Sequence, residues 1–545
     1  KPNIQDQYGI SPLHLAAQNG HIEVVKLLLE KNDKPNIQDQ YGTSPLLLAA
    51  RNEHVEVVRL LLGKEANPNI RDKYGDSALL LAARNGHVEV VRHLLEKEAD
   101  SNIKDQYGDS ALHLAAQNGH VEVVKRLLGK DADPNIKDND GTSPLLLAAP
   151  KGHVEVVRLL LEKGAEPNIQ NQFGKTPLHT AAQNGHSEVV QLLLEKGTKP
   201  NIQDQYGDSA LLLAAQNGHV EVVRLLLEKG AEPNIQNNNR ISPLHLAAQN
   251  GHVKVVRLLL EKGAEPNIQN QFGKTPLHTA AQNGHSEVVQ LLLEKGTKPN
   301  IQDQYGDSAL LLAAQNGHVE VVRLLLEKGA EPNIQNNNRI SPLHLAAQNG
   351  HVKVVRLLLE KGAEPNIQNQ FGKTPLHTAA QNGHSEVVQL LLEKGTKPNI
   401  QDQYGDSALL LAAQNGHVEV VRLLLEKGAE PNIQNNNRIS PLHNAAENGH
   451  VEVVKLLLRN KADRNIQNNI GQTPLEIAKQ NKHNANANAN ANAIVKMLKQ
   501  HNTFQKVVNN FTFLFKKCTP NKKGSQSNPS RNNQASGFTT VVSNS

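Results

Sequence analysis

The chain has 545 residues, a small net charge of +5 and aromatic residues at only 3% of its composition. It has no Trp and one Met, so its core must be built from Leu, Val and Ala, which fill many thin layers better than one thick core. A single cysteine, Cys518, excludes an internal disulfide and favours a reducing compartment, and neither an apolar run long enough to span a membrane nor a signal peptide is recognisable.

The charge is divided unevenly along the chain. No Asp or Glu follows Glu476, whereas ten of the 58 Lys and Arg residues do. The chain up to Glu476 therefore carries 48 basic and 53 acidic residues, a net charge of −5, and a basic tail follows it. This distribution argues against nucleic-acid binding by the body of the chain.

A repeat of 33 residues runs through the chain from its start. The phrase Ser11-Pro12-Leu13 returns as Ser-Pro-Leu at Ser44 and as Ser-Ala-Leu at Ser77 and Ser110. The step continues without a slip to Thr473, which gives fifteen units. A fixed period of this length is the signature of a solenoid, in which short elements bury their apolar faces by stacking on the next unit.

Each unit predicts two short helices and a connection. In the sixth unit, Thr176 is placed to cap a first helix that begins at Pro177, and Asn184-Gly185 ends it. A second helix is expected over about 187–196, and residues 200–207 indicate an extended, hairpin-like connection. The apolar residues at inward-facing spacing are Leu178, Ala181, Ala182, Val189, Val190, Leu193 and Leu194.

Three segments of this unit carry a family resemblance. They are residues 173–182 (Phe-Gly-Lys-Thr-Pro-Leu-His-Thr-Ala-Ala), Gly185-His186, and residues 192–197 (Leu-Leu-Leu-Glu-Lys-Gly). The pattern resembles the ankyrin repeat, over roughly residues 1–500. The resemblance implies an all-α solenoid of L-shaped units, each a β-turn plus two antiparallel helices, in a curved right-angled stack whose concave face binds proteins. It also implies that His179 and His186 serve turns and caps through hydrogen bonds.

The units fall into four predicted regions. These are residues 1–164 with five diverged repeats, 165–461 with nine repeats as three near-identical 99-residue blocks, 462–501 with a C-terminal capping repeat, and 502–545 with a basic, largely disordered tail. In the capping repeat Glu476 and Lys479 replace the His and Ala of inner units, and residues 484–493 are an Asn-Ala insertion. Residues 1–4 match the middle of a connection, which leaves room for a further unit before them.

Several residues depart from the repeat where glycine is usual, and at Glu53, where a positive φ is expected, we expect backbone strain. Arg240, Arg339 and Arg438 replace the turn glycine, Glu53 replaces the glycine between helices, and Asn32, Glu65, Glu98 and Asp131 replace the glycine after the second helix. Pro150 should shorten a first helix. Because most of these departures lie in the first five units, we predict that this end is the less stable part.

All seven Tyr residues and three of the eight Phe residues occupy one repeat position, just before the turn glycine, and the other five Phe lie beyond residue 500. We name these ten residues the tip ladder, and the ladder is the predicted protein-binding site: Tyr8, Tyr41, Tyr74, Tyr107, Phe173, Tyr206, Phe272, Tyr305, Phe371 and Tyr404. In ankyrin repeats, tip positions and the exposed ends of the first helices commonly contact partners. The alternative is that each ring packs on its neighbouring tip and holds the stack in line.

The residue after the turn glycine cycles through the copied blocks as Lys175, Asp208 and Ile241, and the same three types follow in the next block. One interpretation is a multivalent surface for a repeated or elongated partner. The other is recent copying without selected binding.

No pattern in the sequence indicates a catalytic site, a metal site or a cofactor. Of the 25 histidines, 22 fall on the two positions exemplified by His179 and His186, without interleaved Cys or paired carboxylates. No nucleophile with a base, phosphate-cradling loop or cluster of acids stands out from the repeat, and residues such as Ser209 are better explained as helix caps. We therefore expect no enzyme activity, no cofactor and no small-molecule substrate.

The tail contains an apolar patch at residues 507–515, followed by Lys516-Lys517 and Lys522-Lys523. It is interpreted as a fold-back over the end of the solenoid, or as an anchor on an anionic membrane or a partner-binding peptide. Our prediction is a monomeric, intracellular and cytoplasmic scaffold or adaptor that binds other proteins through the tips and the concave helix surface. A further hypothesis is a host-directed effector of an intracellular microbe, and the alternative is a spacer or tether whose basic tail binds membrane or nucleic acid.

Overall fold

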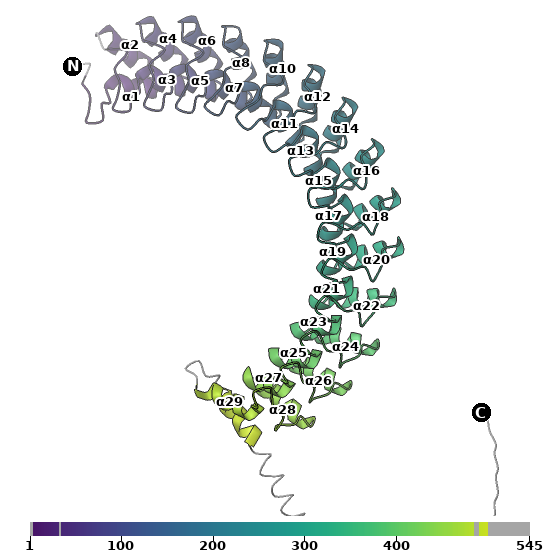
Figure 1. Cartoon of the computed structure of the whole chain (residues 1–545). Coiled ribbons are helices and arrows are strands. Elements are labelled where there is room, and N and C mark those ends of the chain that lie inside the picture. The colour runs from purple at the N-terminus through teal and green to yellow at the C-terminus, as the bar shows by residue number, and fades with distance from the viewer. Residues whose placement is uncertain (1–3, 32–33, 484–489, 500–545) are drawn as a thin grey trace, which may run out of the picture. The chain divides into compact units, whose positions relative to one another are not determined.

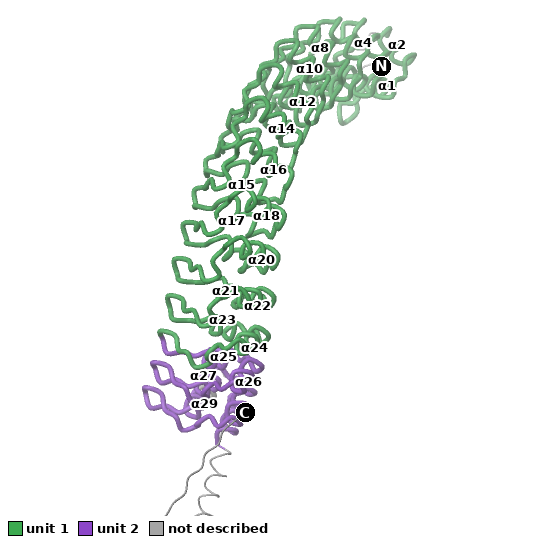
Figure 2. The backbone as a smooth tube through the Cα atoms, turned by 90° about the vertical axis from the view of Figure 1, so that its right-hand side faces the viewer, with its two compact units in different colours: residues 1–403 green, residues 404–545 purple. Residues whose placement is uncertain are grey.

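The structure is a computed structural model that describes residues 4–31, 34–483 and 490–499. These residues form fifteen successive helix pairs joined by turns, with four isolated β-bridges and no strand (Figure 1). The predicted all-α solenoid with a 33-residue step is therefore confirmed. The chain divides into two compact units, residues 1–403 and 404–545, coloured in Figure 2. The four-region division of the sequence stays a prediction.

The first helices of the pairs are short, and they carry odd numbers. In residues 1–403 they are α1 (Pro12–Gln18), α3 (Pro45–Arg51), α5 (Ala78–Asn85), α7 (Ala111–Gln117), α9 (Pro144–Ala148), α11 (Pro177–Gln183), α13 (Ala210–Gln216), α15 (Pro243–Gln249), α17 (Pro276–Asn283), α19 (Ala309–Asn316), α21 (Pro342–Gln348) and α23 (Pro375–Asn382). In the second unit they are α25 (Ala408–Asn415), α27 (Pro441–Glu447) and α29 (Pro474–His483).

The second helices carry even numbers. In residues 1–403 they are α2 (Ile22–Glu30), α4 (Val55–Gly63), α6 (Val88–Glu96), α8 (Val121–Leu128), α10 (Val154–Glu162), α12 (Ser187–Glu195), α14 (Val220–Glu228), α16 (Val253–Glu261), α18 (Ser286–Glu294), α20 (Val319–Glu327), α22 (Val352–Glu360) and α24 (Ser385–Glu393). In the second unit they are α26 (Val418–Glu426) and α28 (Val451–Arg459), and residues 491–499 are also helical.

The sixth helix pair, α11 and α12, has the bounds that its sequence predicts. Thr176 caps α11 in extended conformation, and its hydroxyl group and backbone N–H group form a capping box with His179. Pro177 follows at the first helical position, where its missing N–H group costs no hydrogen bond. Asn184 ends the helix, and Gly185 follows it with φ of +78°. Ser209 caps α13 in the same extended conformation.

The core is a series of thin layers between successive helix pairs. Within residues 1–403, every first helix contacts the next first helix and every second helix contacts the next second helix. The alanines of the first helices are fully buried at almost every unit, and Val189, Val190 and Leu193 of α12 are 0% exposed. Val24 in the first pair is 46% exposed whereas Val57, its equivalent in the next pair, is 1% exposed, because in each later pair the preceding pair covers this valine.

Residues 1–403 form a bent stack in which the first helices line the inner side and the second helices the outer side (Figure 1). The small Ala side chains let first helices approach one another, whereas Val and Leu separate the second helices. The inner side of this unit therefore presents the first helices together with the turns that precede them.

Residues that replace glycine adopt the predicted left-handed backbone. The angle φ is +61° at Glu53, +58° at Glu98 and +56° at Arg240, and positive values occur also at Glu65, Asp131, Arg339, Arg438 and Lys461. Lys461 was not foreseen, and Asn32 lies outside the described residues. Pro150 shortens α9 to five residues, and a 3₁₀ turn, η1 (Ala149–Lys151), replaces its last turn. The positive φ expected at Glu53 and the shortened first helix at Pro150 are thus confirmed.

The last helix pair is built from α29 and residues 491–499, whose Ile494 and Leu498 are buried. Glu476 lies at an exposed position of α29 and its carboxylate accepts hydrogen bonds from the backbone N–H group and hydroxyl group of Thr473, at 2.7 and 3.0 Å. Most of the Asn-Ala insertion, at 484–489, and the whole tail with Cys518 lie outside the described residues. Among the helices that are described, none is both long and apolar enough to cross a membrane.

Candidate functional site

Each tip is a tight turn organised by one acidic or amide side chain. At the first tip, the carboxylate oxygen Oδ1 of Asp6 accepts hydrogen bonds from the backbone N–H groups of Tyr8 and Ile10, both at 2.9 Å. The same pair of bonds recurs where the side chain is an amide, for example from Phe173 and Lys175 to Asn171, both at 3.0 Å. The turn therefore fixes the backbone on both sides of the ring without using the ring.

Neighbouring tips are joined by backbone hydrogen bonds at the ladder position. The carbonyl oxygen of Tyr41 accepts a bond from the N–H group of Lys73 at 2.8 Å, and that of Tyr74 accepts one from Gln106 at 2.9 Å. The bond is also present at tips that have no ring: the carbonyl oxygen of Asp140 accepts it from Gln172 at 3.1 Å. This hydrogen bond between neighbouring tips therefore needs no aromatic side chain.

The ten rings of the tip ladder are exposed. Their exposed fractions run from 41% at Phe371 to 66% at Tyr107, and no ring belongs to the buried core. Exposure of this many large rings at one repeat position provides apolar surface and hydrogen-bonding hydroxyl groups to a partner. The structure therefore brings the sequence-predicted residues to successive tips, and their role as contacts stays a prediction.

One pair of rings in the ladder is occupied by a cation from the chain itself. The Nζ atom of Lys73 lies 4.0 Å from the centre of the Tyr41 ring and 4.9 Å from the centre of the Tyr74 ring. Both distances are within the range of cation–π attraction. Sequence reasoning missed this contact because it joins residues of two adjacent units.

The residue after the turn glycine adds polar groups beside the tips. The Nζ atom of Lys274 donates to the Oε1 atom of Gln282 at 3.1 Å, and the Oδ1 atom of Asp307 accepts from the amide of Asn336 at 2.8 Å. Burial raises the pKa of Asp307, and burial together with nearby Asp105 and Asp138 raises the pKa of Asp109 to about 6. These carboxylates, each two residues after a ring of the ladder, are therefore partly desolvated.

Both histidine positions join one unit to the next. In α15, the Nδ1 atom of His245 accepts a hydrogen bond from the N–H group of Ser242, and its Nε2 atom donates to the carbonyl oxygen of Lys274 in the following unit at 2.8 Å. His252 reaches the other way, from its Nε2 atom to the carbonyl oxygen of Gln216 at 3.0 Å. Burial lowers the pKa of His245 to about 4, so this histidine is neutral near pH 7. The expected capping role is confirmed at the first histidine position, where His245 completes a capping box, whereas the side chain of His252 forms no cap hydrogen bond and links two units instead.

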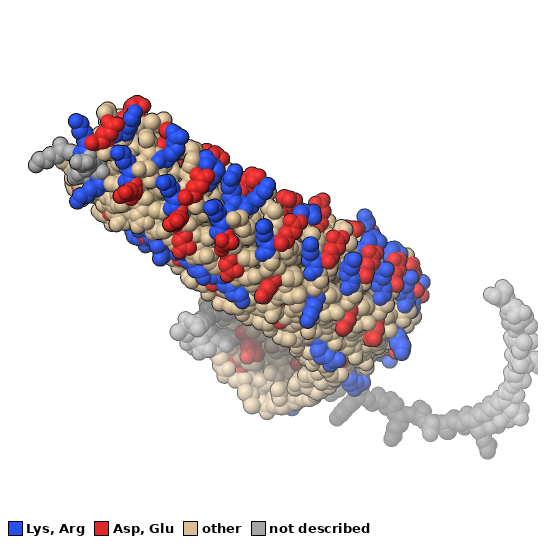
Figure 3. Space-filling model, turned by 90° about the horizontal axis from the view of Figure 1, so that it is seen from above, with Lys and Arg blue, Asp and Glu red and all other residues tan. Residues whose placement is uncertain are grey.

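The outer surface carries charges of both signs. Seen from above in Figure 3, Lys and Arg side chains interleave with Asp and Glu side chains along the stack. Many are pairs within one second helix, such as Arg224 with Glu221 and Arg323 with Glu320, both at 3.3 Å. Exposed pairs of this kind contribute little to stability, and because the two signs alternate, the face shown has no large patch of a single sign.

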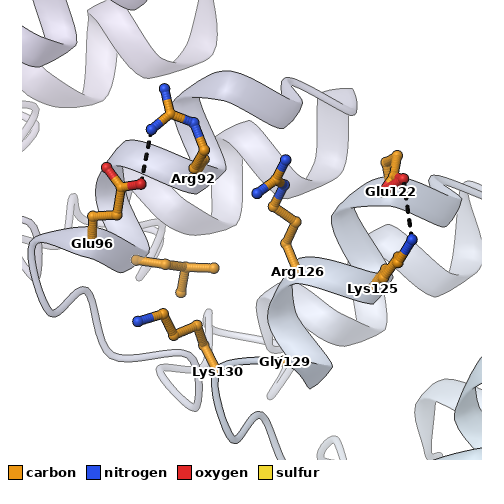
Figure 4. A pocket seen from close by; sticks show the side chains of 8 residues that line it. Arg92, Glu96, Glu122, Lys125, Arg126, Gly129 and Lys130 are labelled. Carbon is orange, nitrogen blue, oxygen red and sulfur yellow. Dashed lines mark hydrogen bonds and ion pairs between the residues drawn. The ribbon is translucent and has the colours of Figure 1, made fainter.

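A pocket of about 390 Å³ lies on this outer side, between α6 and α8 (Figure 4). Arg92 on one wall pairs with Glu96 at 2.8 Å, and Lys125 on the other pairs with Glu122 at 3.8 Å. None of the ladder rings lines the pocket. Within the described residues, no group of three or more His, Cys, Asp or Glu side chains is arranged to hold a metal ion.

Comparison with known families gives one result. A family model described as ankyrin repeats in three copies matches overlapping segments of the chain: 1–72, 64–138, 124–204, 145–237, 211–303, 244–336, 295–369, 343–435 and 409–509. A search of curated proteins finds no match. Ankyrin repeats are generally protein–protein interaction modules, and proteins built from them are typically non-enzymatic scaffolds.

Proposed function

Because the chain belongs to the ankyrin-repeat family, whose model matches it from residue 1 to residue 509, we propose that it is a non-enzymatic scaffold that binds protein partners. The partners contact the tip ladder and the neighbouring inner surface of the first helices. We propose also that the scaffold is monomeric and acts inside cells, as ankyrin-repeat proteins commonly do.

One observation carries the proposal: the ladder rings are exposed, whereas the hydrogen bonds that join neighbouring tips come from the backbone and from polar side chains such as Gln203 and Asn238. Tyr206 is 60% exposed, and its carbonyl oxygen accepts the hydrogen bond from Asn238 at 3.1 Å that links its tip to the next one. The ring-free tip at Asn239 forms the same bond to Gln271 at 3.1 Å. A ring that the fold does not require at ten of the tips is best explained by contact with a partner.

We include in this proposal a specific setting: the scaffold acts as a host-directed effector of an intracellular microbe, binding proteins of the host cell. The second candidate function is a spacer whose basic tail, residues 502–545, tethers it to a membrane or a nucleic acid. It is favoured by the absence of acidic residues after Glu476.

The experiment compares partners captured from cell lysate by three forms of the chain. The first is the parent, the second has all ten ladder residues changed to Ser, and the third lacks residues 502–545. As a matched control, ten exposed residues of the second helices are changed to Ser. Circular dichroism establishes that each form keeps its helix content.

We expect partners that bind the parent, the tail-deleted form and the control but not the ladder variant. Equal capture by the ladder variant and the parent would contradict the ladder as the contact. Loss of capture on deleting the tail, with binding that weakens as salt is raised, would establish the tether instead.

A further inference from the structure

The starting point is the cation between Tyr41 and Tyr74. The side chain of Lys73 is exposed, and its backbone N–H group donates a hydrogen bond to the carbonyl oxygen of Tyr41. Its Nζ atom lies 4.0 Å from the centre of the Tyr41 ring and 4.9 Å from the centre of the Tyr74 ring. An ammonium group at these distances interacts with the negative faces of both rings. The chain itself thus shows that the space between two consecutive ladder rings accepts a cation.

Four other ring pairs in residues 1–403 are built in the same way, but among the described residues no cation lies between their rings. In each, the residue before the second ring donates its N–H group to the carbonyl oxygen of the first ring residue, at 2.9 to 3.0 Å. That residue is a neutral, exposed glutamine whose side chain forms no hydrogen bond in the part of the chain that the structure describes. The four pairs, each with its glutamine, are Tyr8 and Tyr41 with Gln40, Tyr74 and Tyr107 with Gln106, Phe173 and Tyr206 with Gln205, and Phe272 and Tyr305 with Gln304.

Carboxylates accompany most of these pairs. The occupied pair ends in Asp72-Lys73-Tyr74-Gly75-Asp76, and three of the four open pairs end in the same sequence with Gln in place of Lys. In the copied blocks, Asp208 and Asp307 accept hydrogen bonds from asparagine amides and form no ion pair with Lys or Arg in the described residues. A carboxylate two residues after a ring complements a cation bound at the tip and disfavours an anion.

We propose that the open ring pairs of the tip ladder bind Lys or Arg side chains of an extended, basic segment in a partner protein. This inference rests on the proposed function and adds the chemistry of the partner. The net charge of −5 on the chain up to Glu476 attracts such a segment. Neighbouring tips are about 9 Å apart, which an extended peptide spans with roughly three residues. The open pairs at Tyr206 and Tyr305 lie three tips apart, so a peptide with a cation at every third residue includes the spacing that matches both.

The test measures the affinity of the full chain for a fluorescent peptide that carries Lys at every third residue among serines. Matched peptides carry Gln or Glu in place of Lys, and fluorescence anisotropy is recorded at physiological ionic strength, where long-range attraction is screened. The Lys peptide should bind and the other two should not. Binding of the Gln peptide as tightly as the Lys peptide would overturn the proposal.

Variants of the residue that precedes the second ring of a pair test the proposal more directly than the peptide series. Gln205→Lys and Gln304→Lys copy the arrangement of Lys73, so each should fill its own ring pair and weaken peptide binding about two- to fivefold. Lys73→Gln should empty its ring pair and strengthen binding by a similar factor. Gln191→Lys and Gln290→Lys add the same charge on α12 and α18 and serve as controls for net charge, which should leave affinity within twofold of the parent.

Removing one ring distinguishes cation–π attraction from apolar contact. Tyr206→Leu keeps an apolar side chain but removes the ring face, and it should weaken binding of the Lys peptide about as much as Gln205→Lys does. An unchanged affinity in Tyr206→Leu, or equal losses in Gln205→Lys and its control Gln191→Lys, would overturn the proposal. If the Lys peptide does not bind while a protein captured from lysate still requires the ladder rings, the inference about cations is wrong and the proposed scaffold function is retained.

Discussion

Non-glycine residues hold a left-handed backbone at eight places in the described part of the chain, among them Glu65, Glu98 and Asp131 at the end of a second helix. At the equivalent glycines of later units, such as Gly164 and Gly230, an added Cβ atom would meet nothing within 4 Å. The cost of a side chain there is thus a property of the backbone, about 1–2 kcal/mol, and not of crowding.

Replacing such a residue by glycine should stabilise the array. We expect Glu98→Gly to raise the free energy of unfolding by about 1 kcal/mol, because the gain in backbone energy exceeds the extra entropy of glycine in the unfolded chain. Urea unfolding followed by circular dichroism measures the change. The reverse substitution, Gly230→Ala, should lower the free energy by a similar amount, and no change in either variant would contradict the backbone explanation.

The buried histidines make stability depend on pH. Burial lowers the pKa of His245 and His344 to about 4, so the folded chain takes up protons less readily than the unfolded chain, where the pKa of histidine is about 6.5. Their contribution is complete above about pH 6.5 and is lost as the pH falls toward about 4, by up to about 3 kcal/mol for each histidine. Asp109, whose pKa is raised to about 6, acts in the opposite direction, since its carboxyl group is more easily buried when protonated.

We therefore expect the urea midpoint to fall between pH 7 and pH 5. His179, His278 and other buried histidines with lowered pKa add to the effect and outnumber the aspartates with raised pKa. The double variant with His245→Gln and His344→Gln should have a lower urea midpoint than the parent at pH 7. Its midpoint should fall less than that of the parent between pH 7 and pH 5. An equal fall of the urea midpoint in the parent and the variant would mean that groups other than these two histidines cause the pH dependence.

At this scale the sequence predicts what is local to one unit. The helix cap at Thr176 and the positive φ at Glu53 follow from residue type and repeat position. The hydrogen bond from His245 to Lys274 and the cation–π contact of Lys73 join two units, so they depend on how far apart neighbouring units lie. The ladder position was predicted, whereas the independence of its backbone bonds from the ring required the structure.

At the scale of single helices, α9 differs from its neighbours because of one residue. It ends at Ala148, whereas α7 and α11 each run for seven residues and end at the glutamine equivalent to Pro150. Proline lacks the N–H group that would donate to Leu146, and the chain forms the 3₁₀ turn η1 instead. The hydrogen bond from His186 to the carbonyl oxygen of Pro150, at 2.9 Å, is kept.

Pro150→Gln should restore the missing turn. We expect α9 to extend through residue 150 and the free energy of unfolding to rise by about 1 kcal/mol, because a helical hydrogen bond is regained near the end of the helix. Hydrogen exchange of residues 149–153 measures the local protection, and urea unfolding measures the stability. The matched control is Gln216→Pro in α13, which should shorten that helix. Unchanged exchange in Pro150→Gln would mean that the turn is set by other contacts.

Helix bounds were largely predictable because the cap residues lie in the sequence beside the helices they bound. Ser187 and Glu195 delimit α12 within one residue of the expected range. The expected hairpin-like connection forms turns with isolated bridges, such as Gln203 to Ser209, rather than strands. The tip contains too few residues between its turn and the next helix cap to pair as a ladder of strands.

At the scale of the whole molecule, stability should vary along the stack. The first five helix pairs contain Glu53, Glu65, Glu98, Asp131 and Pro150, all of which cost energy, whereas the copied blocks repeat one pattern with fewer departures. Because each unit contacts only its neighbours, such costs remain local and lower the stability of that segment.

Hydrogen exchange should therefore be faster in α1–α10 than in α11–α24. A chain in which Glu53, Glu65, Glu98 and Asp131 are changed together to Gly should slow exchange in the first segment and leave the second unchanged. Uniform exchange along the parent chain would contradict the prediction and would indicate a stack that unfolds as one cooperative unit.

The three copied blocks have a consequence for how the gene can change. Equivalent contacts between units have the same geometry in successive blocks: the bonds from His245 to Lys274 and from His344 to Lys373 are both 2.8 Å, and Val255 and Val354 are both 0% exposed. Removal of residues 264–362 would place the end of the first block, at residue 263, against the start of the third block, at residue 363. This contact has the same sequence as the one already present between residues 263 and 264, and insertion of another block would repeat it. Unequal recombination between the copies can thus lengthen or shorten the array by 99 residues without creating a new interface, so its length is free to vary between generations while its fold is not.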